Sequence, residues 1–230
     1  MRLANQWLLS FTLILSSTIA HPQLKKKLDP KLARIRYSFS VHAGAPPLTF
    51  LVQVDESSVV TGVQVFQPSN AAPFQTLPAC KDLPMQLFEG DERLTLVEHA
   101  DVNFDGYEDI ELLQYLNAHL GKKVFCVYLW DPASGRFQYE PQLFIADPVP
   151  HPDTKTITSH AEYFGGEHID STFHWEGAKL VLVSESGLVR GPKLECGFVE
   201  YSRKPIKGKM QTMDENYTDC DEKPHLFPQR

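Results

Sequence analysis

Segments in which apolar and polar residues alternate recur along most of this 230-residue chain, and this period of two restricts it to folds made of β-strands. The pattern begins in Arg36–Val41, Leu48–Val54 and Val59–Phe66, which turn-forming residues separate. It returns in segments 93–99, 110–115, 124–130, 139–145, 155–161, 171–175 and 180–185. Helical periodicity is nearly absent. We therefore expect an all-β fold, either β-propeller-like or a sandwich of short antiparallel strands.

The N-terminal segment 1–20 has the features of a secretory signal peptide, with Arg2 near its start, an apolar run, and small residues before Ala20. A membrane anchor would need about 20 apolar residues, and this run is shorter. Residues 67–92 have no sustained period and read as a long connection with a short helical turn near Lys81. The expected parts are the signal peptide over 1–20, a solvated lead-in over 21–34, a single all-β domain over 35–204 and a polar tail over 205–230.

The nonapeptide 101–109 places oxygen-bearing side chains at alternate positions around Gly106, where the chain can turn with a positive φ. Calcium takes six to eight oxygens at about 2.3–2.6 Å, and such a loop supplies them. An EF-hand is excluded because Leu112 stands where its bidentate Glu belongs, and the flanks favour strands that close a hairpin. A polar turn that bonds its own backbone is the alternative. The expected ligands are the side chains of Asp101, Asn103, Asp105 and Asp109 and the carbonyl of Tyr107.

The four cysteines, Cys80, Cys126, Cys196 and Cys220, all follow the signal peptide and are too widely spaced for metal-binding knuckles. Exported thiols tend to oxidise, and four cysteines allow two bridges in three connectivities. Proximity in the sequence favours Cys80 with Cys126 and Cys196 with Cys220. The alternative for Cys126 is a buried free thiol.

Cleavage after Ala20 removes one of the 22 Lys and Arg residues and none of the 29 Asp and Glu residues, which leaves a net charge of −8. This balance argues against nucleic acid or an anionic membrane surface as a partner and suits a cationic protein or a divalent metal. The nine His residues are scattered, and no HExxH, GxSxG or CxxC motif occurs. We expect a periplasmic or secreted binding protein and not an enzyme, and we assign no catalytic residue.

Four motifs resemble those of a family of small exported bacterial proteins. They are Asp101–Ile110, Trp130–Phe137, Lys155–Ser159 and His174–Glu185, in the family's order. The resemblance implies a calcium-binding, β-propeller-like fold and a role like that of an immunity protein that inhibits a lysozyme-like peptidoglycan hydrolase delivered by a type IV secretion system. Residues 21–92 and 186–230 lie outside the resemblance, and the family's lipoprotein-type export signal is missing here.

An inhibitor of such a hydrolase needs a rigid, exposed loop that fills a cleft containing two carboxyl groups. The segment 162–168 offers aromatic anchors, two glycines and a histidine, and the Ser-Gly-Arg turn offers an arginine. The candidate partner contacts are Arg136, Tyr163, Phe164, Glu167 and His168. An ordinary exposed hairpin tip is the simpler reading of 162–168. Two other functions stay open, a calcium-dependent adhesion or surface-assembly module and an enzyme acting on envelope glycans.

Overall fold

Strands make up nearly all of the regular structure in the computed structural model, which describes residues 26–27, 29, 35–80, 85–117, 122–163, 166–190 and 198–217. The strands are β1 (Arg36–Phe39), β2 (Leu48–Val54), β3 (Val60–Phe66), β4 (Gln75–Pro78), β5 (Val97–Ala100), β6 (Asp109–Asn117), β7 (Lys122–Asp131), β8 (Arg136–Tyr139), β9 (Val149–His151), β10 (Thr156–Glu162), β11 (His168–Glu176), β12 (Lys179–Arg190), β13 (Phe198–Ile206) and β14 (Lys209–Tyr217). Two short 3₁₀ helices are η2 (Asp91–Arg93) and η3 (Pro141–Leu143). The all-β prediction is confirmed.

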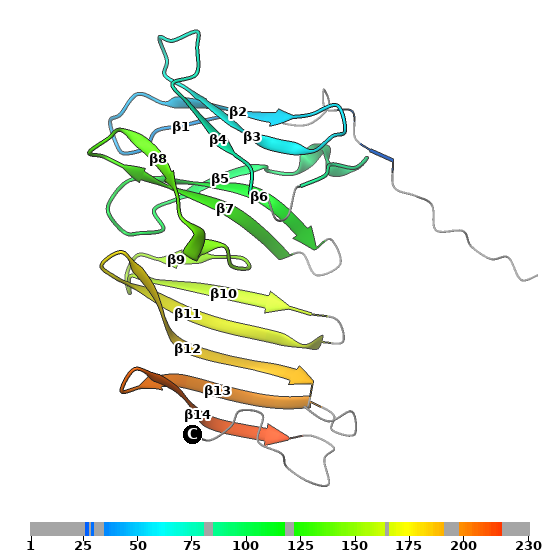
Figure 1. The fold of residues 1–230 in the computed structure, drawn as a ribbon, viewed down its shortest axis with the longest axis vertical. Coiled ribbons are helices and arrows are strands. Elements are labelled where there is room, and N and C mark those ends of the chain that lie inside the picture. The colour runs from blue at the N-terminus through cyan, green and yellow to red at the C-terminus, as the bar shows by residue number, and fades with distance from the viewer. Residues whose placement is uncertain are drawn as a thin grey trace, which may run out of the picture.

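The strands form three antiparallel sheets in which each strand lies beside its neighbours in the sequence (Figure 1). The first sheet has the order β1-β2-β3-β4, the second β5-β6-β7-β8, and the third β14-β13-β12-β11-β10-β9. None of the three sheets closes into a barrel. The architecture is therefore a layered, sandwich-like arrangement built from consecutive hairpins.

The hydrophobic core lies between the first two sheets. Phe50 of β2 and Phe137 of β8 meet edge to face, with ring centroids 5.9 Å apart. Polar contacts join the same sheets, because Gln75 donates to the carbonyl of Phe137 at 2.7 Å and accepts from its amide at 3.0 Å. The hydroxyl of Tyr37 accepts from the amide of Leu96 at 2.7 Å. Packing and these cross-sheet bonds fix the first two sheets as one unit.

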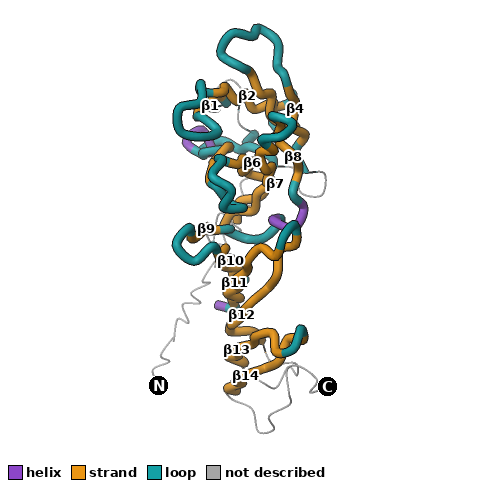
Figure 2. The backbone as a smooth tube through the Cα atoms, turned by 90° about the vertical axis from the view of Figure 1, so that its left-hand side faces the viewer, coloured by secondary structure: helices purple, strands orange, loops and turns teal. Residues whose placement is uncertain are grey.

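The third sheet forms a single layer that extends away from that unit (Figure 2). Ile157, Val199 and Tyr201 are the large apolar side chains buried in its described part. The side-chain amide of Gln142, in η3, connects the third sheet to the segment that follows the second sheet. Its nitrogen donates to the carbonyl of Ala178 at 3.0 Å, and its oxygen accepts from the backbone amide of Leu180 at 2.9 Å. This sheet is therefore held more by hydrogen bonds between strands than by a core of its own.

Gly187 allows the strands in the middle of the third sheet to approach one another closely. A Cβ atom at this position would lie 2.4 Å from the carbonyl oxygen of His168 and 3.3 Å from the ring of Tyr201. Tyr201 is paired with Gly187 across β12 and β13, so its ring covers the space that a side chain would fill. The glycine is required here for close approach of the strands.

A disulfide joins the first sheet to the second. Cys80, just after β4, bonds Cys126 in β7, with a Cα–Cα distance of 5.9 Å. This confirms the first of the two predicted pairs and replaces the free-thiol alternative for Cys126, although that residue is fully buried. The second predicted pair, Cys196 with Cys220, lies outside the described residues.

Several segments differ from the sequence-based expectation. β4 lies within 67–92, which was expected as a connection without a strand. The segment 93–99 begins in η2 and becomes extended only at Val97, and 139–145 contains η3 because Pro141 has no amide to donate to a sheet. Regular structure also continues beyond 204 into β14, which pairs with β13 over residues that were expected as tail. The signal peptide and the helical turn near Lys81 lie outside the described residues. No helix in the described part of the chain is long and apolar enough to cross a membrane.

Candidate functional site: the 101–109 loop and the groove beside it

The nonapeptide 101–109 connects β5 to β6 as the tip of a hairpin. Ala100 and Asp109 are paired across the two strands, and extended chain enters and leaves the loop. The predicted strand flanks are therefore confirmed next to the loop, although the first is a strand only from Val97, and no helix adjoins the loop as it would in an EF-hand.

Side-chain oxygens turn inward toward the amides of the loop. The carboxylate of Asp101 accepts from the amides of Asp105 at 3.1 Å and Gly106 at 2.9 Å. Asn103 also accepts from the amide of Asp105 at 3.1 Å, and Asp105 accepts from that of Tyr107 at 3.0 Å. Gly106 has a φ of 90°, as the loop pattern requires. These bonds gather the oxygens of positions 1, 3 and 5 on one side of the turn.

Asp109 closes the loop from within the protein. Its fully buried carboxylate accepts from the amide of Val102 at 3.0 Å and from that of Trp130 at 2.8 Å. Burial raises the pKa of Asp109 to about 7, against the lowering effect of the two amides, and the charges of Asp105 and Asp101 raise it further. The three carboxyl groups are thus close enough to repel one another, a repulsion that a divalent cation would relieve.

The donor set fits calcium, because it consists of carboxylate, amide and carbonyl oxygens with no sulfur or imidazole. As they stand, no three His, Cys, Asp or Glu side chains of the described residues are gathered tightly enough to hold a metal ion. Binding of a cation would therefore require the side chains of half-buried Asp101 and exposed Asp105 to come closer to that of Asp109. Asn103 and the carbonyl of Tyr107 would complete the predicted set.

Neighbouring segments support the loop on three sides. The amide of Glu108 donates to the carbonyl of Val41 at 2.7 Å, and the indole of Trp175 donates to the carbonyl of Val102 at 2.9 Å. His99 of β5 pairs with the carboxylate of Glu108 at 2.9 Å. The loop is therefore connected to segments of all three sheets, and its conformation affects each of them.

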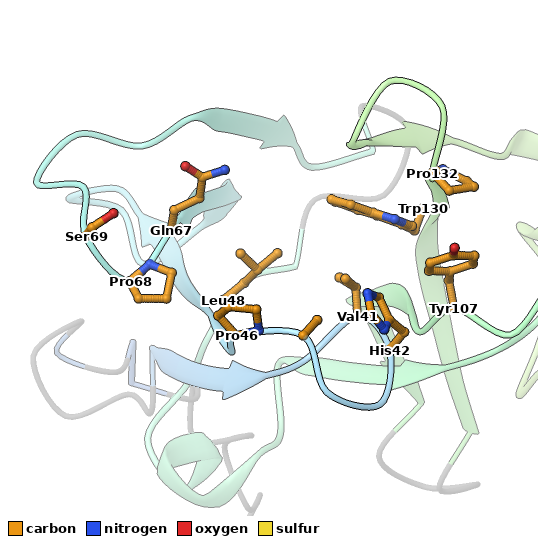
Figure 3. Close-up of a pocket in the computed structure, with 11 residues that line it drawn as sticks. Val41, His42, Pro46, Leu48, Gln67, Pro68, Ser69, Tyr107, Trp130 and Pro132 are labelled. Carbon is orange, nitrogen blue, oxygen red and sulfur yellow. The ribbon is translucent and has the colours of Figure 1, made fainter.

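A groove of about 560 Å³ lies beside the loop (Figure 3). Gln67, Pro68 and Ser69, from the β3–β4 connection, stand on one side, and Trp130 and Tyr107 stand on the other. Tyr107 is the seventh residue of the loop, so the residue whose carbonyl is a predicted calcium ligand also contributes its ring to the groove. The sequence reasoning missed this groove because its walls come from segments far apart in the chain.

The fold matches that of a solved protein. It is similar to a structure described as a Xanthomonas type IV secretion system related protein, with a TM-score of 0.53 and 16% sequence identity over 84% of this chain and 100% of that chain. At this identity the likeness establishes the fold alone. No protein-family model and no curated protein sequence matches the chain.

The predicted partner contacts do not form one surface. Arg136 lies at the β7–β8 turn, where its guanidinium donates to the carbonyl of Phe74 at 3.0 Å. Tyr163 is 50% exposed in the β10–β11 connection, which Figure 1 shows at the opposite end of the strands. Glu167 and His168 lie beside it, and the side chain of Glu167 accepts from the amide of Arg190 at 2.6 Å. Phe164 lies outside the described residues.

Glu111 is a buried acid that the sequence analysis did not single out. It is 5% exposed on β6, and its Oε1 has no hydrogen-bond partner among the described residues. Burial, and then the charge of Glu98, raise the pKa of Glu111 to about 8, while Lys123 opposes the shift. Lys123 itself pairs with Glu98. The alternation of apolar and polar residues predicted only that Glu111 lies in a strand.

Proposed function

We propose that the chain is an exported calcium-binding protein that inhibits a peptidoglycan hydrolase, as an immunity protein does, without turnover of its own. The fold likeness carries this proposal, because it spans the whole of a solved protein related to a type IV secretion system. The resemblance of four motifs points to the same kind of protein. The Cys80–Cys126 bridge suits an oxidising compartment such as the periplasm.

Inhibition would use the exposed loops at one end of the sheets. The candidate contact is the β10–β11 connection, since Tyr163 offers an exposed aromatic anchor on a hairpin whose ends are paired. The amide of Tyr163 donates to the carbonyl of Glu167 at 2.7 Å, which closes the connection and limits the entropy lost on binding. The net charge of −7 would favour encounter with a basic hydrolase.

The proposal is tested by mixing the purified protein with a lysozyme-like hydrolase and following turbidity of a peptidoglycan suspension. We expect co-elution of the two proteins, loss of hydrolase activity, and no hydrolysis by this chain alone. Tyr163→Ala should weaken inhibition about tenfold or more, as expected for an aromatic anchor. Tyr115→Ala, which removes a similarly exposed tyrosine from β6, is the control. Full hydrolase activity at saturating inhibitor would contradict the role.

Calcium-dependent adhesion is a second candidate, favoured by the groove that shares Tyr107 with the metal loop. In that case the protein should bind cell surfaces, EGTA should abolish the binding, and hydrolase activity should be unaffected.

A further inference from the structure

None of the described residues that line the groove beside the loop has an acidic or basic side chain of the Asp, Glu, Lys or Arg type. Its lining consists of apolar, aromatic, proline, amide, hydroxyl and imidazole groups, in a chain that contains 51 charged residues of the four common types, 22 basic and 29 acidic. A charged ligand entering the groove would lose hydration without meeting an opposite charge. The groove therefore favours a neutral ligand.

The polar groups of the groove both donate and accept hydrogen bonds. Gln67 has an amide, Ser69 and Tyr107 have hydroxyls, and His42 has an imidazole. The Nδ1 atom of His42 lies 2.8 Å from the carbonyl of Ala43, so it carries the proton and Nε2 is left as an acceptor. Such a set suits a ligand that is itself rich in groups that donate and accept, such as hydroxyl and acetamido groups.

Aromatic rings form one wall. Trp130 and Tyr107 both line the groove on the side shown at the right of Figure 3, and the ring of His42 meets that of Tyr107 edge to face at 5.5 Å. The indole is held in place from behind by Phe137, with ring centroids 4.8 Å apart. Rigid aromatic surface of this kind binds flat, weakly polar faces at a low entropic cost.

Strand addition by a peptide is disfavoured in this groove. Pro46, Pro68 and Pro132 line it, and none of them has a backbone amide to donate to an added strand. The groove must therefore recognise its ligand through side chains and not through pairing with the backbone. The volume of about 560 Å³ lies within the range of small-molecule sites, roughly 300–1,000 Å³.

We propose that this groove binds a neutral oligosaccharide, with one sugar ring stacked on Trp130 and Tyr107 and its hydroxyl or acetamido groups bonded to Gln67, Ser69 and His42. The C–H face of a sugar ring supplies the flat apolar surface, and its rim supplies the donors and acceptors.

The calcium loop would control the shape of this groove. The amide of Glu108 holds the carbonyl of Val41, which lines the groove, and the carboxylate of Asp109 holds the amide of Trp130. Tyr107 immediately precedes Glu108 and Asp109 in the sequence. A cation that orders residues 107–109 would therefore preorganise the wall, and this part of the inference rests on the proposed calcium site.

The test is a fluorescence titration of the exported protein with its natural tryptophans, of which Trp130 lines the groove and Trp175 does not. The probes are chitotriose, cellotriose, maltotriose and, as the competing occupant, a decaproline peptide. We expect at least one trisaccharide to change the emission with saturation below about 10 mM, a weak affinity typical of small neutral ligands. Isothermal titration of the same protein repeats the measurement.

Gln67→Ala and Tyr107→Ala should each weaken binding about tenfold, while Tyr115→Ala should leave it unchanged. Gln67 is exposed, so its variant tests the groove without disturbing the core. Failure of every trisaccharide to bind folded protein, or binding of decaproline in place of sugars, would overturn the proposal. Sugar binding that is unchanged by EGTA would refute only the proposed effect of calcium on the groove. Melting curves recorded with and without calcium show separately whether the metal binds.

Discussion

Removing the bridge between Cys80 and Cys126 should destabilise the native protein without changing any residue of the 101–109 loop. We consider the double variant Cys80→Ala/Cys126→Ala, which leaves Cys196 and Cys220 in place. The bond closes a loop across a sequence separation of 46 residues and joins the first sheet to the second. Without it, the unfolded chain regains the conformational freedom that the closed loop denies it.

The magnitude follows from the loop length. For a loop of 46 residues the chain-entropy relation gives about 13 cal/mol/K, or about 4 kcal/mol at 25 °C. A domain of this size loses about 2–4 °C of melting temperature for each kcal/mol, so we expect a fall of about 8–16 °C. Buried Cys126 adds a smaller packing loss when its sulfur is removed.

The assay is thermal unfolding followed by circular dichroism under oxidising conditions, with calcium in excess so that the metal site is constant. The single variants Cys80→Ala and Cys126→Ala should each match the double variant within about 1 kcal/mol, because either change abolishes the same bond. A double variant that melts within about 2 °C of the native protein would refute the reasoning. So would free-thiol titration of the folded native protein that finds Cys80 and Cys126 reduced.

Three further outcomes test the loop and the third sheet. Excess EGTA, or Asp105→Ala, should lower the melting temperature by about 5–10 °C, because a ligand at 100 times its Kd stabilises the native state by about 2.7 kcal/mol. An unchanged melting curve in EGTA would count against calcium binding. In EGTA the free energy of unfolding should fall as pH rises from about 4 to about 7, with up to about 4 kcal/mol of the fall due to Asp109, because folded Asp109 keeps a proton that the unfolded chain has lost. In urea titrations at several pH values, Asp109→Asn should remove this part of the slope and leave the part due to buried Glu111, whose pKa is also raised. Gly187→Ala should destabilise by more than about 2 kcal/mol, because its Cβ would lie 2.4 Å from the carbonyl of His168, whereas the same change at exposed Gly44 should cost less.

The features that could be predicted from the sequence are those that depend on near neighbours. The segments 171–175 and 180–185 were expected as strands, and they lie in β11 and β12, which are joined by a turn in which Gly177 has a φ of 63°. The 101–109 loop was recognisable because its oxygens and Gly106 follow a fixed spacing, which the backbone of the loop obeys. Residues that are close in the sequence determine both conformations, so a local sequence pattern is enough to predict them.

The features that escaped prediction depend on distant contacts or on an absent core. In β14 the described side chains alternate between exposed and half-buried, so the strand has no apolar face that a periodicity argument could detect. The groove escaped because His42, Gln67 and Trp130 come together only when the first two sheets pack. The two candidate contacts, Arg136 and the segment 162–168, lie at different turns, an arrangement that depends on how the sheets are placed.

The consecutive order of the strands also bears on how the chain reaches its native state. Every strand in the three sheets pairs with the strand made just before it or just after it, so no sheet must wait for a segment from the far end of the polypeptide. Short-range pairing of this kind lowers the entropic barrier to folding. A chain that passes amino terminus first through a membrane pore can therefore finish one layer while the next is still in transit, and only the Cys80–Cys126 bond and the packing of layers need to follow.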